Sequence, residues 1–289
     1  MIQHLSRKEL DVEKYNACIT NSVQSRIYAY SWYLDIVADN WDVLVLNDYE
    51  AVMPLPWRKK YFIKYSSQPF FTQQLGVFSL CVLDAKTLKM FVEKTSKKFL
   101  KIALQLNAEN KIGHKNITKK TNYVLELNDS YKTLYKEFSK GRKHAIQKGL
   151  KNNLTIEEAP FEKIVLIAKE NYSYQELKEH DFQKLRNLIS LLSKKEKAII
   201  LGVYIDASLI GGSVFVLDSN RIIYLFSAMT SKGKKLQVPS LLIDSMIKRY
   251  SKSKVVLDFE GSMLPNIASF FKSFGAKKES YFLLKKRWL

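Results

Sequence analysis

The stretch that decides the fold is SAMTSKGKKLQVPSLLIDSMI, residues 227–247, which leads from an apolar strand into an amphipathic helix. Before it, RIIYLFSAM (221–229) has the β-branched and aromatic composition of a strand. After it, Pro239 suits the first turn of a helix, and Leu242 and Met246 share one helical face. This stretch therefore predicts a strand, a short basic loop and a helix whose N-terminus lies at one edge of a sheet.

On both sides of this stretch, the sequence indicates more strands. AIILGVYI (198–205) and LIGGSVFVL (209–217) form a meander with 221–229, separated by short turns. VVLDF (255–259) follows the helix as a short buried strand. Because a strand–helix–strand crossover is parallel, we predict that 221–229 and 255–259 are parallel neighbours. Two helices precede the meander, FEKIVLIAKENYSY (161–174) and HDFQKLRNLISLLSKK (180–195). A helix from Pro265 to Gly275 and a strand YFLLKKRW (281–288) follow at the end of the sequence.

The first half repeats this order of elements. We expect a helix in SRIYAYSWYLDIVADN (25–40), a hairpin of 41–47 and 51–57 whose second strand is stopped by Pro54 and Pro56, a helix at 85–100 and a strand at 101–107. The length of 289 residues exceeds one typical domain of about 100 to 150 residues. We predict an α/β protein with a mixed sheet and two related halves, residues 1–127 and 128–289.

Composition restricts the function classes. The longest apolar runs fall short of the ~18 residues of a membrane span, and the N-terminus has no signal-like apolar region, so we expect a cytoplasmic protein without an integral membrane segment. The two cysteines and four scattered histidines show no metal-ligand spacing, and serine-nucleophile and P-loop patterns are absent. The net charge of +19 suits an anionic partner such as nucleic acid, a coenzyme pyrophosphate or an anionic membrane surface, or it reflects lysine-rich composition alone.

Several motifs carry a family resemblance. LDFEGSMLPNIASFFKSFGAK (257–277) and the 227–247 stretch resemble the GNAT acyltransferase domain of the bacterial FemAB-like and BioF2-like proteins. YSSQPFFTQQLGVF (65–78) resembles a Gln-Pro and Thr-Gln-Gln-Leu-Gly signature of that group, and FSKGRKHAIQKGLKNNL (138–154) is similar to its basic interdomain linker. The resemblance implies a tandem GNAT fold and N-acyltransferase activity. The loop keeps one glycine where a standard GNAT loop has several.

The donor site is expected in the loop between the strand at 221–229 and the following helix. Free amides, a helix dipole and lysines there suit the pyrophosphate of coenzyme A; a solvated basic turn is the alternative. The candidate donor-binding residues are Ala228, Met229, Lys232, Gly233, Lys234, Lys235, Leu236, Gln237 and Val238.

Candidate catalytic groups lie nearby. Asp258 and Glu260 are two residues apart at the end of a strand, so both side chains can point to the same side, beside this loop. Either carboxylate could take a proton from an amine, and Glu260 is the first choice. The alternative is that these carboxylates cap a turn or pair with a lysine. The resemblance implies that Lys272 is an oxyanion donor and Tyr224 a proton donor to the leaving thiolate, unless Lys272 is an ordinary surface lysine.

The acceptor is expected to contact polar and aromatic residues. The candidate acceptor-binding residues are Gln68, Phe70, Thr72, Gln73, Gln74 and, on the basic linker, Arg142. The alternative for the glutamines is that their amides are hydrogen-bonded to the backbone in the core. The alternative for Arg142 is that it faces water. We expect transfer of an acyl group from acyl-CoA or acyl carrier protein to a small amine or a cell-envelope precursor, without a permanently bound cofactor or a metal. The alternatives are a Fem-type transferase that uses aminoacyl-tRNA on a peptidoglycan precursor, and a GNAT-fold binding protein without activity.

Overall fold

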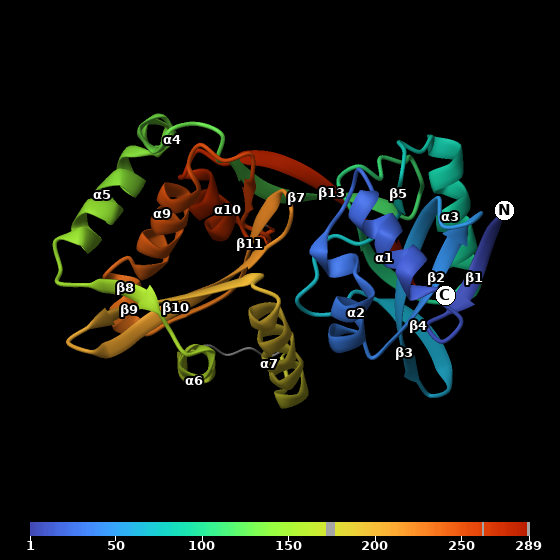
Figure 1. The fold of residues 1–289 in the computed structure, drawn as a ribbon, viewed down its shortest axis with the longest axis horizontal. Coiled ribbons are helices and arrows are strands. Elements are labelled where there is room, and N and C mark those ends of the chain that lie inside the picture. The colour runs from blue at the N-terminus through green and yellow to red at the C-terminus, as the bar shows by residue number, and fades with distance from the viewer. Residues whose placement is uncertain (172–176, 262, 288–289) are drawn as a thin grey trace. The chain divides into compact units, whose positions relative to one another are not determined.

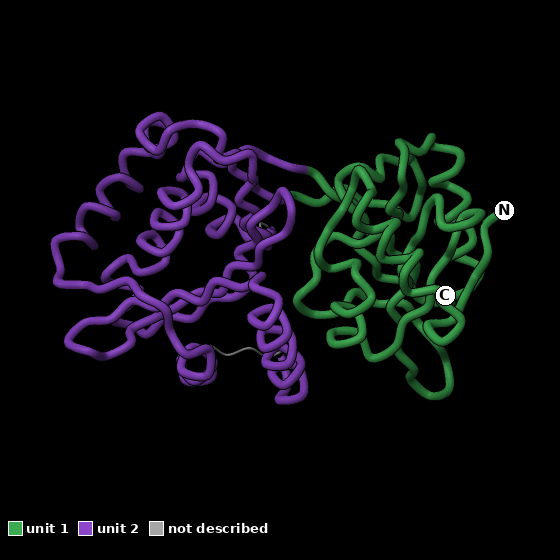
Figure 2. The backbone as a smooth tube through the Cα atoms, viewed as in Figure 1, with its two compact units in different colours: residues 1–121, 280–289 green, residues 122–279 purple. Residues whose placement is uncertain are grey.

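The computed structural model describes residues 1–171, 177–261 and 263–287, which divide into two compact units. Unit 1 comprises residues 1–121 and 280–289, and unit 2 comprises residues 122–279 (Figure 2). Strands β7 (Ile117–Glu126) and β13 (Lys277–Lys286) each begin in one unit and end in the other. The end of the chain therefore belongs to unit 1, and not to the second half as the sequence suggested, because Phe282–Lys286 of β13 pair with β6 (Ile102–Leu106).

Unit 1 is built on a sheet of order β1-β2-β3-β4-β6-β13 (Figure 1). Its other strands are β1 (Ile2–Ser6), β2 (Asn40–Leu46), β3 (Ala51–Lys60), β4 (Ile63–Ser67) and the short β5 (Phe78–Ser79), which pairs with β3. Its helices are α1 (Val12–Asn21), η1 (Ile27–Ala29), α2 (Ser31–Val37) and α3 (Ala85–Lys98). The core below the sheet gathers Leu44, Met53, Phe91 and Leu104, all buried.

Two local predictions in unit 1 were wrong. The predicted helix at 25–40 is divided into η1 and α2, because Tyr30 between them has an extended backbone. The hairpin of β2 and β3 is present, but Pro54 and Pro56 do not stop β3, which continues to Lys60. Both prolines pair with β2 on one side of β3. On its other side, β3 pairs with β5 before Pro54 and with β4 after Pro56, so the missing N–H groups interrupt no hydrogen bonds to these two strands.

Unit 2 has the sheet order β7-β12-β11-β10-β9-β8. Its other strands are β8 (Thr155–Glu158), β9 (Ala198–Ile205), β10 (Ser208–Leu217), β11 (Arg221–Met229) and β12 (Val256–Asp258). Its helices are α4 (Tyr131–Glu137), α5 (Lys140–Leu150), α6 (Phe161–Asn171), α7 (Glu179–Lys194), α8 (Ser231–Lys235), α9 (Val238–Tyr250) and α10 (Pro265–Lys272). The predicted meander and the predicted parallel pair of β11 and β12 are confirmed.

The basic segment 138–154, similar to an interdomain linker, is largely the helix α5. Ser139 caps α5 by accepting a hydrogen bond from the backbone N–H of Arg142, and Ile146 and Gly149 are buried. A Cβ at Gly149 would lie 3.0 Å from the methyl groups of Leu241 on α9, so the glycine permits close packing of the two helices. Residues 172–174 of one predicted helix, Ser262 of the closing motif and Trp288 of the last strand lie outside the described residues.

Candidate active site where β11 and β12 diverge

Strands β11 and β12 are parallel neighbours over only three residue pairs. Their register runs from Arg221 with Val256 to Ile223 with Asp258, where β12 ends, while β11 continues to Met229. The backbone then turns away from β11, because Glu260 and Gly261 both have positive φ, of 50° and 56°. Beyond Ile223, the edge of β11 that faced β12 is therefore no longer covered by that strand.

A cavity of about 420 Å³ lies at this divergence. Its walls come from β11, from the segment after β12 and from α10, and most of its lining is apolar. The lining residues are Leu177, Tyr224, Leu225, Phe226, Ser227, Phe259, Glu260, Gly261, Ile267 and Phe271. The rings of Phe259 and Phe271 stack at 4.7 Å between centroids and fix one wall. A largely apolar cavity with a few polar groups is the usual form of a small-molecule site.

Glu260 brings a carboxyl group to this cavity. Its backbone N–H donates to Oδ1 of Asp258 at 3.0 Å, which fixes the chain direction just after the strand. Burial disfavours the charged carboxylate and raises the pKa of Glu260 to about 8. A carboxyl group that titrates near neutral pH can both take up and release a proton under physiological conditions.

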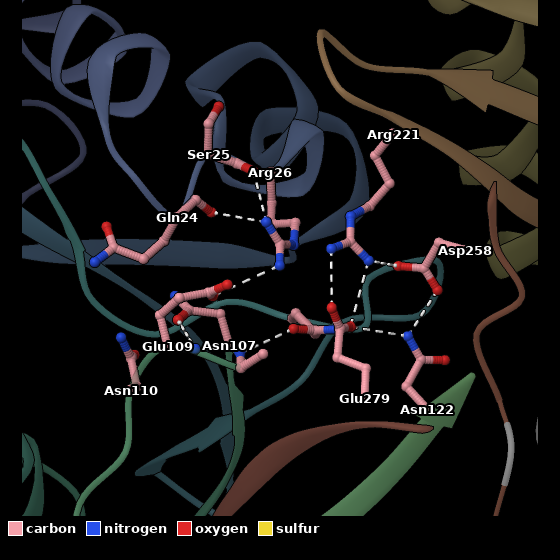
Figure 3. A network of polar contacts seen from close by, with 12 residues as sticks. Gln24, Ser25, Arg26, Asn107, Glu109, Asn110, Asn122, Arg221, Asp258 and Glu279 are labelled. Carbon is pink, nitrogen blue, oxygen red and sulfur yellow. Dashed lines mark hydrogen bonds and ion pairs between the residues drawn. The ribbon is translucent and has the colours of Figure 1, made fainter. Parts of the chain in front are cut away.

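Asp258 lies in a different environment, a buried ionic network of unit 2 (Figure 3). Its Oδ2 accepts from Nη1 of Arg221 at 2.6 Å, and its Oδ1 accepts from Nδ2 of Asn122 at 2.7 Å. Nη2 of Arg221 also bonds Oε1 of Glu279 at 3.0 Å. These contacts engage both oxygens of Asp258 and tie β12 to β7, β11 and β13, so this carboxylate holds the sheet and Glu260 in place.

Arg221, Asn122 and Glu279 were not predicted from the sequence as part of the site. Arg221 begins an otherwise apolar strand, and a charge at a buried strand position needs a partner, which is a usable signal. The identity of the partners depends on pairings between strands that are far apart in sequence. Figure 3 also shows a buried arginine in unit 1, Arg26, whose Nη1 donates to the carbonyl oxygens of Gln24 and Ser25.

The other two catalytic candidates differ in their position. Tyr224 lines the cavity, its ring packs edge-on against Phe271, and its hydroxyl oxygen accepts from Oγ of Ser213 at 3.4 Å. Lys272 follows Phe271 on α10 but is exposed and is not among the residues that line the cavity. The structure thus brings Tyr224 and Glu260 to one cavity and leaves Lys272 on the helix surface.

The predicted donor loop folds into the short helix α8 and the first turn of α9. The side-chain oxygen of Thr230 accepts from the backbone N–H of Gly233 at 3.0 Å, and the carbonyl oxygen of Thr230 accepts from that of Lys234. Farther along, the N–H groups of Leu236 and Gln237 donate to carbonyl oxygens of Lys232 and Lys234. Several amides that were expected to hold an anion are therefore engaged within the chain.

The single glycine of the loop serves packing. A Cβ at Gly233 would lie 2.1 Å from the carbonyl oxygen of Ile210 on β10, so only glycine fits there. Ala228, Met229 and Val238 are buried, and Gln237 has a left-handed backbone with φ 62° at the start of α9. The side chains of Lys232, Lys234 and Lys235 are exposed and are the groups of this loop that can attract an anion.

The predicted acceptor residues of unit 1 hold a loop against β6. Gln68 accepts from the backbone N–H of Gln105 and donates to Oγ1 of Thr72, both at 3.0 Å. Oε1 of Gln74 accepts from the backbone N–H of Ala108, and Nε2 of Gln74 donates to Oε1 of Gln73. Phe70 packs against Phe71. These hydrogen bonds agree with the alternative prediction, in which the glutamine amides are hydrogen-bonded within the core.

Arg142 is buried in unit 2 and does not face water. Its Nε donates to Oγ of Ser273 at 2.9 Å and Nη1 donates to Oγ of Ser240. The guanidinium also lies over the rings of Phe270 and Phe274, at 4.2 and 4.6 Å from their centroids. Desolvation lowers the pKa of Arg142 to about 10. This arginine therefore joins α5 to α9 and α10.

Comparisons with known proteins place the chain by its fold. No protein-family model and no curated protein matches its sequence. The structure is similar to the crystal structure of FemX, with 10% identity, coverage of 97% of this chain and 96% of that one, and a TM-score of 0.66. It is also similar to a tandem GNAT protein from the clavulanic acid biosynthesis pathway, with 10% identity, 99% of both chains covered and a TM-score of 0.55.

A third match is the C-terminal domain of a putative lysylphosphatidylglycerol synthetase from Agrobacterium fabrum, with 10% identity, coverage of 96% and 92%, and a TM-score of 0.54. The chain has a tandem GNAT fold of the FemAB-like kind, as its sequence predicted. These likenesses, at 10% identity, are likenesses of fold. Among the described residues, no helix is long and apolar enough to cross a membrane.

Proposed function

We propose that the chain is an N-acyltransferase whose reaction takes place in the cavity between β11 and the segment after β12. The observation that carries the proposal is the position of Glu260, a carboxyl group with a pKa raised to about 8, at the point where two parallel strands diverge. The uncovered edge of β11 offers backbone groups to an extended, amide-containing donor, much as a sheet edge accepts an added strand. The cavity is large enough for the reacting acyl group and amine.

The proposed reaction is a direct transfer without a covalent enzyme intermediate. Glu260 takes one proton from the ammonium form of the acceptor, and the resulting amine nitrogen attacks the carbonyl carbon of the donor. The nitrogen–carbon bond forms and the bond from carbon to the leaving sulfur breaks. Tyr224 gives a proton to the thiolate and regains one from the amide nitrogen as it forms. Positioning of the two reactants in the cavity supplies much of the acceleration.

We propose a thioester of coenzyme A or of acyl carrier protein as the donor. Lys232, Lys234 and Lys235, exposed just after the end of β11, supply positive charge for its phosphate groups. Their contribution is electrostatic and falls with rising salt concentration. A double Lys234→Ala and Lys235→Ala variant should therefore bind a thioester several-fold more weakly, and the loss should be smaller at high salt.

A second candidate donor is aminoacyl-tRNA. Two observations favour it: the backbone amides of the loop are engaged within the chain, and the net charge is +19. The fold likeness to FemX agrees with this alternative. Both donors place an activated carbonyl carbon in the same cavity, so the role of Glu260 is common to them.

Calorimetry with a panel of donors separates these candidates. The native chain is titrated with acetyl and long-chain thioesters of coenzyme A, with acyl carrier protein and with aminoacylated tRNA. Binding of a thioester, followed by transfer to an amine, supports the first candidate, and binding of charged tRNA alone supports the second. Binding without transfer to any amine indicates the inactive binding protein considered above, and no binding by any donor overturns the proposal.

A further inference from the structure

The hairpin of β3 and β4 in unit 1 ends in a tight turn made of two aromatic residues (Figure 1). Lys60 pairs with Ile63, so the loop consists of Tyr61 and Phe62 alone. Both have positive φ, of 47° and 66°. Two-residue hairpin turns of this kind favour Asn-Gly, because side chains with a bulky Cβ substituent are disfavoured in the left-handed region.

These two rings are also almost completely exposed. Tyr61 is 82% and Phe62 is 100% accessible to solvent. The corresponding two-residue turn of unit 2, between β9 and β10, has Asp206 and Ala207 at the same positive-φ positions. One acidic residue and one small residue suffice for that turn. The aromatic pair is therefore not required by the geometry of the β3–β4 turn. The ammonium group of Lys60 lies 5.4 Å from the ring centroid of Tyr61, and Phe62 is completely exposed. The left-handed backbone and the exposed rings together point to a partner that covers the rings.

The charge around the turn indicates the chemistry of this partner. Residues 51–83 contain no aspartate or glutamate. Lys59, Lys60 and Lys64 on the hairpin are exposed, as is Lys101 at the start of the neighbouring β6. The remaining cation, Arg58, is paired with Asp39 at 2.7 Å. Beside the turn, a hollow of about 430 Å³ is lined by Lys60, Tyr61, Ile63, Tyr65 and Lys101.

We propose that the β3–β4 turn is a peripheral membrane anchor that inserts Tyr61 and Phe62 into the surface of a bilayer rich in anionic lipids. Exposed aromatic rings at a protruding tip bury favourably at the boundary of headgroups and acyl chains. Lysines around them pair with lipid phosphates while their stems lie along the rings. The hollow with Lys60 and Lys101 is placed to receive one headgroup. This inference stands independently of the proposed transfer reaction.

The hairpin fits a lipid surface better than a nucleic acid. Its exposed cations are lysines, which act as point charges. The arginine that would stack on bases or grip a phosphate in a bidentate manner is already paired with Asp39. Both residues form the tip of the turn, and of the two only Tyr61 also lines the hollow with Lys60 and Lys101. Binding to single-stranded RNA is accordingly the outcome that would replace this proposal.

Vesicle flotation with the full chain tests the anchor. The native chain should float with phosphatidylcholine vesicles that contain phosphatidylserine, and less with phosphatidylcholine alone. The Tyr61→Asn and Phe62→Gly double variant restores the favoured turn, so it should fold with an unchanged or higher melting temperature. Its partitioning to the anionic vesicles should fall at least about tenfold. Val82→Ser removes another exposed apolar side chain outside the hairpin and should leave partitioning unchanged.

A second variant separates charge from insertion. Replacement of Lys59, Lys60 and Lys64 by glutamine should weaken binding to anionic vesicles about 100-fold, while binding to phosphatidylcholine alone changes little. Equal flotation of the native chain and the Asn-Gly variant would overturn the proposal. So would the absence of flotation by the native chain, or a single-stranded RNA affinity that the Asn-Gly variant loses while its vesicle binding persists.

Discussion

The segments that follow β11 and β12 leave the same pair of parallel strands, but they use their polar groups differently. After β11, Thr230 and the carbonyl groups of α8 engage the amides of the loop, and Gly233 is required by its contact with Ile210. After β12, two residues with positive φ turn the chain away, and Glu260 remains at a cavity. The two segments therefore differ in whether their polar groups are engaged within a loop or line a cavity, and glycine or lysine content alone does not predict this difference.

The largest expected effect concerns the buried ionic network of Asp258, which holds β12 and the segment after it in place. Asp258→Ala removes one of the two carboxylates that accept hydrogen bonds from Arg221 and Asn122 in a buried site, and it leaves Glu279 as the other. We expect a loss of about 2–3 kcal/mol in the free energy of unfolding, because two charge-assisted hydrogen bonds are lost while Arg221 keeps its ion pair with Glu279. Urea denaturation measures it, with Glu158→Ala on the exposed face of β8 as the control. A change below about 1 kcal/mol would mean that Asp258 does not anchor β12.

Glu260 should carry the proton transfer, whereas Asp258 supports it. Glu260→Gln should lower kcat/KM at least about 100-fold, the lower range for removal of a general base. In the native chain, kcat/KM should rise with pH and level off above about pH 8, because only the ionised carboxylate accepts a proton. The variant should lose this rise. A pH–rate profile of native activity that is flat between pH 6 and about 9 would contradict the assignment.

The same carboxyl group should affect stability with a defined sign. The folded-state pKa of Glu260 lies above the ordinary value of 4.5, at about 8. Between these values the folded state holds a proton that the unfolded state has released, so this group lowers stability as pH rises. Above about pH 8, Glu260→Gln should be more stable than the native chain by roughly 1–2 kcal/mol, after allowance for partial solvent exposure. Thermal unfolding at pH 5 and above pH 8 compares them, and an equal difference at both pH values would argue against the raised pKa.

The smallest effect is expected in the loop after β11. Thr230→Ala removes the side-chain oxygen that accepts from the N–H of Gly233 and should cost about 1 kcal/mol of stability, as loss of an N-cap does. If the loop attracts the donor through its lysine ammonium groups, donor affinity should change by less than about twofold. A large gain in affinity in calorimetry would show that the released amide binds the donor after all.

Local patterns predicted the part of the fold that carries the candidate site. The meander, α9 and α10 have regular apolar spacing and clear turn residues, so their sequence alone places β11 beside β12. That junction in turn pointed to Asp258 and Glu260 beside the donor loop, whereas Tyr224 was predicted from the family resemblance. The short stretch of pairing and the cavity depend on the backbone at Glu260 and Gly261, which the sequence did not indicate.

The remaining features depend on contacts between distant residues. The segment of α5 was described from the sequence only as a basic linker, because its lysines and glycines conceal the buried side of Ile146 and Gly149. Arg142 was expected to face a partner or water, but two serines and two phenylalanines from α9, α10 and the turn after α10 surround it. The return of β13 to unit 1 is set by its pairing with β6, nearly two hundred residues earlier.

The most direct test of the central claim is to fill the cavity. Ser227 lines it, and Ser227→Trp places an indole ring where the donor is proposed to lie, whereas Ser219→Trp adds the same ring on an exposed turn. Calorimetry should show that the donor bound by the native chain binds equally to the Ser219→Trp chain and is lost from the Ser227→Trp chain. Equal binding by all three folded chains would contradict a transfer site where β11 and β12 diverge.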